Sequence, residues 1–212
     1  MVKIHVYIEG GGDGNSGLIV ACQKGFREFL ANAQINVGKV KLIPCGNRGR
    51  ALKNFRLALK NGLIALLLVD SEGPVHANHQ SGDSETWRPW SHLESRPDDG
   101  WKLPEGATEQ DCHLMVQCTE SWLIADRAAL RHFFGQHFKA ARLPAPTAKI
   151  ESIPAEAIIK SLKLATSECE TKRPYDKGAH SFELLSRIDP AKVKAASPWA
   201  ARFLAELKSR AP

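Results

Sequence analysis

The chain has 212 residues, of which 43% are hydrophobic and 25% are charged, a composition typical of a folded globular protein. A core of this size needs neither disulfides nor a structural metal to be stable. The longest apolar run, residues 63–69, is far shorter than the roughly 18 residues of a membrane span, and the N-terminal MVKIHVYIEG has no signal-peptide pattern. We therefore expect a cytoplasmic protein that does not enter a membrane.

The net charge of +6 is confined to the C-terminal third of the chain. Residues 1–138 hold 15 basic and 15 acidic side chains, whereas residues 139–212 hold 14 basic and 8 acidic ones. A basic surface of this kind fits a polyanion such as nucleic acid, and it equally fits an ordinary solvated helical face. Both interpretations stay open at this point.

Strands and helices are predicted in alternation over the first third of the chain. Alternating β-branched residues predict a strand over residues 2–8. A glycine-rich turn comes next, and a helix is predicted over residues 16–33. The next strand, residues 39–44, precedes a helix over 50–61, and the apolar run at 63–69 predicts a third strand buried on both faces. This β-α-β-α-β order implies parallel strands with right-handed crossovers.

The rest of the chain predicts one more strand and several helices. A polar stretch over residues 73–111 is typical of a long functional or mobile loop. After it we expect a strand at 113–117, a helix that begins at Thr119 or Ser121 and ends at Phe134, and a proline-punctuated linker at 139–153. Short helices are predicted at 155–167, 181–188 and 199–209.

Together these elements predict an α/β protein of two parts. The core, residues 1–138, is a Rossmann-like, mostly parallel sheet of about four strands with flanking helices, and it includes the long loop at 73–111. The remainder, residues 139–212, is a small, basic, helical C-terminal extension that packs on this core.

Acidic side chains follow two of the predicted strands. Glu9 comes directly after the first strand, and Asp70 and Glu72 follow the third. Because ligands of open parallel sheets bind outside the carboxyl ends of the strands, we expect these acids at one rim, with Asp13 of the glycine-rich turn within reach. Clustered carboxylates repel one another unless a cation lies among them, and hard oxygen ligands suit Mg²⁺ or Mn²⁺. The alternative is that these acids cap helices or lie on the surface.

The glycine-rich turn has a second interpretation. Gly12, Gly14 and Gly17 fit the G-x-G-x-x-G pattern of dinucleotide-binding folds. Such folds need an acid near the end of the second strand to hold a ribose, and residues 44–47 contain none. Glu9 would also repel a pyrophosphate at this turn. We therefore favour a metal site over a nucleotide cofactor.

Two arginines follow the second strand at the same predicted rim. Arg48 and Arg50 are candidates for binding phosphate or nucleic acid, because a guanidinium group binds phosphate through paired hydrogen bonds. Salt bridges to the neighbouring acids explain these arginines equally well.

The segments VYIEGGGD and LLLVDSEG resemble the Toprim (topoisomerase-primase) domain, which has a glutamate after its first strand and a D-x-D pair after its third. Glu9 matches that glutamate, Asp70 matches the first aspartate, and Glu72 stands where the second aspartate is usual. Further segments are similar to a bacterial Toprim-like family of unknown function, of the DUF4276 type. They are GNRGRALKNF (46–55), HLMVQCTESWLIAD (113–126), YDKGAHSFELLSRIDPAKV (175–193) and SPWAARFLAEL (197–207).

This resemblance implies metal-dependent phosphodiester chemistry or nucleic-acid binding. Glu9 would act as general acid/base or as a ligand, and Asp70 and Glu72 as ligands of the metal. Members of the family look like partners of ATPases in anti-phage or mobile-element settings, which implies an ATPase partner encoded nearby. The leading hypothesis is a Mg²⁺- or Mn²⁺-dependent nuclease, with DNA favoured over RNA. The alternatives are a non-catalytic module that binds nucleic acid or an ATPase, and a hydrolase of small phosphorylated metabolites.

Three residues of the later segments are further candidates for the same site. Glu120, at the start of a predicted helix, is either an additional metal ligand or a favourable charge at a helix N-terminus. Lys177 fits the neutralisation of phosphate charge in a transition state, and His180 fits the transfer of a proton. A helix cap at Ser181 explains this last segment equally well.

Overall fold

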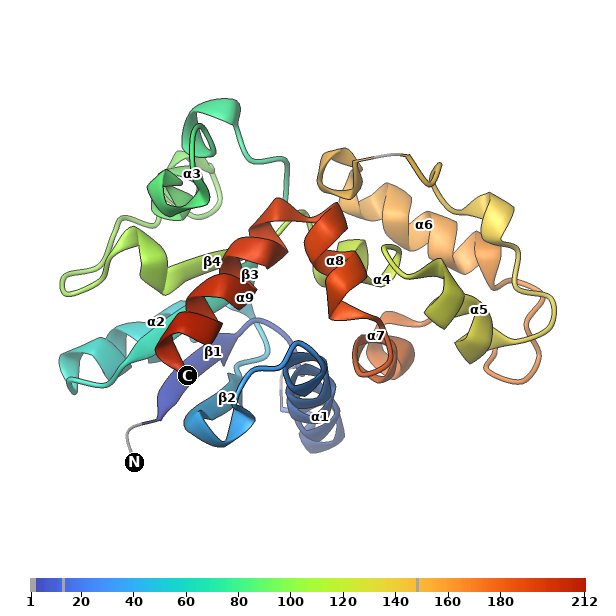
Figure 1. Cartoon of the computed structure of the whole chain (residues 1–212), viewed down its shortest axis with the longest axis horizontal. Helices are drawn as coiled ribbons and strands as arrows, with labels where there is room; N and C mark the ends of the chain where they lie inside the picture. The colour runs from blue at the N-terminus through green and yellow to red at the C-terminus, as the bar shows by residue number, and fades with distance from the viewer. Residues whose placement is uncertain (1–2, 13, 148) are drawn as a thin grey trace.

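The computed structural model describes residues 3–12, 14–147 and 149–212. At its centre is a sheet of four parallel strands in the order β2-β1-β3-β4 (Figure 1). The prediction of an α/β fold built on a parallel sheet is therefore confirmed. The strands are β1 (Ile4–Ile8), β2 (Val40–Pro44), β3 (Ala65–Asp70) and β4 (Cys112–Met115).

Helices flank this sheet. The crossovers between the first three strands contain α1 (Ser16–Asn32) and α2 (Arg48–Lys60), and α3 (Pro89–Ser95) precedes β4. No helix among the described residues is both long enough and apolar enough to cross a membrane. The helices after β4 are α4 (Thr119–Leu123), α5 (Arg127–Phe134), α6 (Ala155–Ala165), α7 (Lys177–Leu185), α8 (Pro190–Ala196) and α9 (Pro198–Arg210).

The strand β3 is buried along its whole length, as the apolar run predicts, but it begins at Ala65 rather than at residue 63, and Leu63 and Ile64 before it are exposed. Successive side chains of a strand point to opposite faces of the sheet. Leu66 and Leu68 accordingly pack into one core layer together with residues of α1 and α7. Leu67 and Val69 pack into the other layer, with residues of α2 and α3. With both faces covered by apolar side chains, polar groups gather at the ends of the strands.

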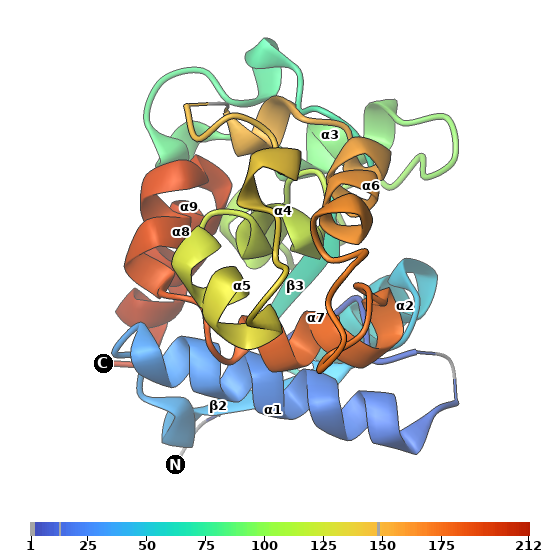
Figure 2. The same ribbon diagram turned by 90° about the vertical axis from the view of Figure 1, so that its right-hand side faces the viewer.

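The helix α7 lies alongside α1 (Figure 2), and a glycine permits their close approach. A Cβ atom added to Gly25 of α1 would lie only 2.5 Å from the carbonyl oxygen of Phe182 in α7. No side chain fits at this distance without a shift of one helix. The absence of a side chain at Gly25 therefore fixes the position of α7 over the sheet.

We expect the substitution Gly25→Ala to destabilise the protein by about 1–3 kcal/mol, the usual cost of overpacking. Without such a contact, an alanine inside a helix stabilises a protein by about 1 kcal/mol relative to a glycine. A loss of stability instead of a gain therefore indicates the close contact. The control is Gly49→Ala in α2, where the added Cβ would approach no atom closer than 3.6 Å and where we expect no loss. Urea unfolding of both variants measures the difference, and equal stabilities would contradict the close contact.

Residues 73–111 form a packed segment that contains a helix, α3, which the polar sequence did not predict. Trp87 and Trp90 are buried in the core layer beside α2. Arg202 of α9 is also buried, and its guanidinium group donates hydrogen bonds to the carbonyl oxygens of Ser84 (2.9 Å) and Glu109 (2.6 Å). The segment is thus held in place by tryptophan burial and by a helix that lies about 100 residues further along the chain.

The single helix predicted over residues 119–134 is in fact two, α4 and α5. Asp126 lies between them and caps α5, because its carboxylate accepts a hydrogen bond from the backbone N–H of Ala129 at 3.1 Å. The same carboxylate accepts a hydrogen bond from the backbone N–H of Asp189 at 3.0 Å. This break depends on a contact between distant parts of the chain, which helical periodicity cannot reveal.

The helix predicted over residues 181–188 begins earlier, at Lys177. Asp176 caps it by accepting a hydrogen bond from the backbone N–H of Ala179 at 2.8 Å. The predicted cap at Ser181 is therefore wrong, because Ser181 lies inside α7, where its hydroxyl oxygen is 2.6 Å from the carbonyl oxygen of Lys177 and caps no helix. The helix α8 was not predicted.

Candidate metal centre

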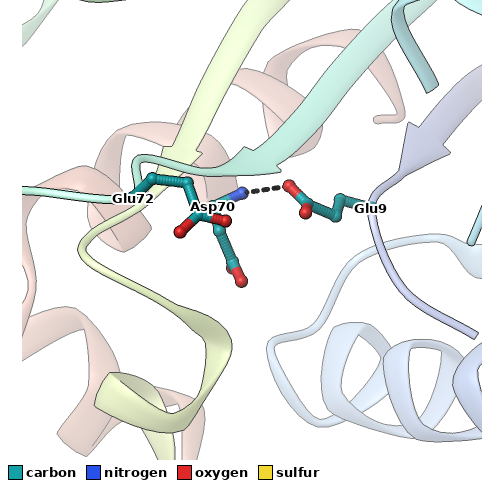
Figure 3. A group of neighbouring side chains, drawn as sticks. All are labelled: Glu9, Asp70 and Glu72. Carbon is teal, nitrogen blue, oxygen red and sulfur yellow. Dashed lines mark hydrogen bonds between the residues drawn. The ribbon is translucent and has the colours of Figure 1, made fainter. Parts of the chain in front are cut away.

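The ends of two adjacent parallel strands bring three carboxylates together. Glu9 directly follows β1, Asp70 is the last residue of β3, and Glu72 lies two residues beyond it. The pairing of Ile8 with Leu68 aligns these strand ends, so that a carboxylate oxygen of Glu9 accepts a hydrogen bond from the backbone N–H of Asp70 at 3.0 Å (Figure 3). One oxygen from each of the three acids lies within 4.8 Å of the others.

Asp70 is the most firmly held of the three acids. Its side chain is buried, and its Oδ1 atom accepts hydrogen bonds from the backbone N–H of Thr119 (3.0 Å) and from the Thr119 hydroxyl (3.2 Å). Thr119 is the first residue of α4, which follows β4. These two bonds occupy one oxygen, and the second oxygen of Asp70 stays available to a ligand.

Glu72 is exposed and lies in a strained turn. Its backbone adopts φ 58°, a left-handed conformation rarely found outside glycine. Its carboxylate lies 3.6 Å from Arg48, whose guanidinium also binds Asp99 at 2.9 Å and lies 4.9 Å from the centre of the Trp101 ring. Arg48 is therefore engaged by acids and by an aromatic ring, as the salt-bridge interpretation expected.

Burial makes the charged forms of two of these acids costly. It is the largest cause of the rise in the pKa of Glu9 to about 7, and the nearby charge of Glu72 adds to this rise. Burial, followed by the charge of Glu9, also raises the pKa of Asp70 well above its ordinary value. A divalent cation among the three carboxylates would favour their charged forms and remove this cost.

A fourth carboxylate, Glu120, lies beside this cluster and is completely buried. Its Oε1 atom accepts hydrogen bonds from the hydroxyl groups of Tyr175 (2.9 Å) and Ser181 (3.1 Å). Its Oε2 atom has no hydrogen-bond partner among the described residues, and the nearest cation is the ammonium group of Lys177, 3.5 Å away. One oxygen of Glu120 is therefore fixed by hydroxyl groups, and the other is held, among the described residues, only by the longer ion pair with Lys177.

Lys177 brings a positive charge to this group of acids. Burial lowers its pKa, but the charges of Glu120 and Asp70 outweigh that effect and raise the pKa above the ordinary value for lysine. The ammonium group is thus charged at every physiological pH. Because the side chain is still more than half exposed, at 57%, it can also contact a bound anion.

These groups surround a pocket of about 250 Å³. Its acidic side chains are Glu9, Asp70 and Glu120, and Lys177 supplies the cation. The glycines of the turn after β1 leave part of the wall without side chains, so that a ligand can approach the backbone closely. The other lining residues are Gly10, Gly11, Gly12, Leu18, Gly46, Thr119, Gly178, Ser181 and Phe182.

The remaining candidates are placed differently. The ring of His180 packs against Phe133 and Phe134, and its Nδ1 atom accepts a hydrogen bond from the backbone N–H of Asp176. It does not line the pocket, so the geometry gives no support to a role in proton transfer. Arg50 is exposed on the outer side of α2. Asp13 lies outside the described residues.

The sequence did not single out Tyr175 or Thr119 as site residues, although it offered Thr119 as a possible helix start. In the structure these residues hold Glu120 and Asp70. Both residues are close in the sequence to a predicted site residue. Thr119 directly precedes Glu120, and Tyr175 lies two residues before Lys177. The signal that could have found them is their hydroxyl group, since a buried carboxylate needs hydrogen-bond donors nearby.

The parallel sheet and the acids at the ends of its adjacent strands define an α/β protein with a candidate divalent-metal centre. The model of one protein family, a domain of unknown function (DUF4276), matches residues 8–208. The chain therefore belongs to this family, and the matched region contains all of the acids of the candidate centre. Searches among curated proteins and among solved structures gave no match.

Proposed function

We propose that this chain is a Mg²⁺- or Mn²⁺-dependent nuclease. The observation that carries the proposal is the convergence of Glu9, Asp70 and Glu72, whose carboxylate oxygens lie within 4.8 Å of one another. Three oxygen ligands at the open rim of a sheet suit a hard divalent cation that keeps some of its water. Glu120, which lines the pocket beside Glu9 and Asp70, offers its Oε2 atom as a fourth potential ligand.

A cation held here would supply Lewis-acid activation of a phosphodiester and stabilise the charge that develops on its oxygens. The residues around it have complementary roles. Glu9, at the edge of the pocket beside Asp70, is placed to act as a ligand of the cation or as a general acid/base. The ammonium group of Lys177 neutralises charge on the phosphate, and the hydrogen bonds from Thr119 keep Asp70 in one orientation.

The likeness of the strand-end motifs to the Toprim domain supports the choice of nucleic acid as substrate. Glu9, Asp70 and Glu72 occupy the positions that correspond to its glutamate and D-x-D pair. The side chain of Glu72 is one methylene longer than that of the usual aspartate. The left-handed backbone at Glu72, with φ 58°, sets the direction in which this longer side chain leaves the turn. By the same likeness we propose DNA as the preferred substrate and an ATPase encoded nearby as the partner in a phage-defence setting.

A cleavage assay tests this proposal. Purified chain is incubated with labelled single-stranded and double-stranded DNA and RNA over a titration of Mg²⁺ and of Mn²⁺, with and without the product of the neighbouring gene. We expect cleavage that requires a divalent ion and stops in EDTA. In parallel, calorimetry with Mn²⁺ alone measures binding of the ion without any substrate.

The two measurements separate the possible outcomes. Binding of Mn²⁺ together with cleavage supports the proposal. Salt-dependent binding of DNA without cleavage at any ion concentration would favour a non-catalytic nucleic-acid-binding module. Hydrolysis of small phosphate esters without any cleavage of nucleic acid would replace the proposed substrate by a phosphorylated metabolite.

A further inference from the structure

The charged side chains of α2 are all basic. The helix contains five basic residues and no acidic one, in the sequence RGRALKNFRLALK. Lys53, Arg56 and Lys60 are exposed, and their spacing of three and four residues places them on one face. The opposite face, which includes Ala51 and Phe55, is buried against the sheet.

This face is not neutralised by neighbouring acids. In the described part of the chain, Lys53, Arg56 and Lys60 take part in none of the ion pairs. The even charge balance of residues 1–138 therefore conceals a local excess of positive charge on α2.

A shallow hollow lies beside the C-terminal half of this helix. It has a volume of about 600 Å³ and lies between α2 and residues 102–106. Arg56, Lys60 and Lys102 contribute its cations, and Glu105 contributes one acid. Its apolar residues are Leu59, Leu103 and Pro104. Cationic side chains beside apolar ones suit an anionic ligand that also has an apolar part.

The basic face lies on the helix that begins at the candidate metal centre. Arg48, the first residue of α2, lies 3.6 Å from Glu72, and Lys60 ends the helix. Twelve residues of α-helix span about 18 Å. A nucleic-acid strand rises about 3.4 Å per nucleotide, so the helix covers the length of about five nucleotides.

We propose that the exposed face of α2, formed by Lys53, Arg56 and Lys60 together with Lys102, binds the backbone phosphates of a nucleic-acid strand up to about five nucleotides from the metal centre. The inference rests on the proposed function for the identity of the substrate. A row of cations on the helix that begins at the centre favours an extended polyanion. An acidic protein surface is the competing occupant.

Fluorescence anisotropy tests the proposal with labelled 25-nucleotide DNA, single-stranded or double-stranded, with labelled RNA of the same length and with labelled polyglutamate. Binding is measured in EDTA, where no cleavage takes place, over salt concentrations from 50 to 200 mM. The variant Lys53→Gln/Arg56→Gln/Lys60→Gln removes three charges from α2. The control Lys160→Gln/Lys163→Gln/Lys194→Gln removes three exposed charges from α6 and α8, and α6 lies at the far end of the molecule from α2 (Figure 1).

We expect the α2 variant to bind at least tenfold more weakly at 100 mM salt and the control to stay within twofold of the wild type. Loss of three phosphate contacts also lowers the slope of log affinity against log salt by about 2–3, since each contact contributes about 0.9. The single variant Lys102→Gln is expected to show a smaller loss in the same direction, which guards against a folding defect of the triple variant.

Three results would overturn the inference. The first is an equal loss in both triple variants, or a loss only in the control, which would assign binding to the basic C-terminal third. The second is no binding of DNA or RNA by the wild type. The third is binding of polyglutamate, but not of nucleic acid, through α2, which would assign this face to an acidic protein. These binding measurements contain no metal and are independent of the cleavage assay. If nucleic acid binds through α2 but is never cleaved in that assay, the proposed nuclease activity is refuted and this inference is not.

Discussion

Asp70→Asn is expected to lower the metal-dependent cleavage rate roughly a thousandfold. The substitution removes the charge of the acid that lies deepest in the cluster. Stabilisation of the transition state by a bound metal amounts to several kcal/mol, and about 1.4 kcal/mol corresponds to a factor of ten in rate. An asparagine oxygen can still accept the hydrogen bonds that Thr119 donates to Oδ1 at 3.0 and 3.2 Å, so the fold should be kept.

The control for this prediction is Asp98→Asn, which removes the same charge from an exposed residue outside the pocket. It should cleave at the wild-type rate. Calorimetry should also show weaker Mn²⁺ binding by Asp70→Asn and unchanged binding by the control. A variant that loses cleavage but binds Mn²⁺ as the wild type does would exclude Asp70 as a ligand and leave it a positioning role.

The convergence of Glu9, Asp70 and Glu72 could be predicted because parallel topology decides it. Once two neighbouring strands run in the same direction, their carboxyl ends lie at one edge of the sheet, whatever the intervening helices do. The pairing of Ile8 with Leu68 then brings the following acids together. Strand direction is encoded locally, in the alternation of strands and helices, so the sequence alone was sufficient.

The second half of the pocket could not be predicted in the same way. The hydrogen bond between Tyr175 and Glu120 joins residues 55 positions apart, and that between Ser181 and Glu120 joins residues 61 positions apart. Neither contact follows from periodicity or from strand order, because both depend on how α7 and the residues before it pack on α4 and α1. The close approach at Gly25 that fixes this packing has no signature in the sequence beyond one helical glycine.

The side chain of Ser181 illustrates the same limit. In the sequence, a serine that precedes an apolar run predicts a helix cap. In the structure, Asp176 is the cap, and the hydroxyl of Ser181 is directed to Glu120 instead. Two residues compete for one local role, and the outcome is decided by a buried acid that lies elsewhere in the chain.

The burial of Glu9 and Asp70 has an energetic consequence that is independent of catalysis. The pKa of Glu9 is 4.5 in its ordinary state and about 7 in the folded protein. The folded chain therefore holds a proton that the unfolded chain has already lost, and stability falls as the pH rises through this range. At about 1.4 kcal/mol per pH unit, the ionisation of Glu9 costs about 3 kcal/mol of the free energy of unfolding by pH 8.

Glu9→Gln should accordingly make the metal-free protein more stable. In EDTA at pH 8 we expect the variant to exceed the wild type by about 2–3 kcal/mol in urea unfolding, and at pH 5 we expect the two to differ little. The glutamine oxygen can still accept the hydrogen bond from the N–H of Asp70. The exposed substitution Glu156→Gln in α6 serves as the control and should leave stability unchanged at both pH values.

The effect of Glu9 on stability must be measured by comparing wild type and Glu9→Gln at each pH, rather than from the pH profile of the wild type alone. His92 and His113 are buried with their pKa lowered, chiefly by burial, so their contribution to stability rises with pH and opposes that of Glu9. The difference between wild type and Glu9→Gln cancels these histidines. Excess Mn²⁺ at pH 8 should stabilise the wild type more than the variant and so narrow the gap. If the difference in stability between the two proteins is the same at pH 5 and pH 8, the destabilisation at this cluster is not electrostatic. If Mn²⁺ leaves that difference unchanged, a cation does not relieve it.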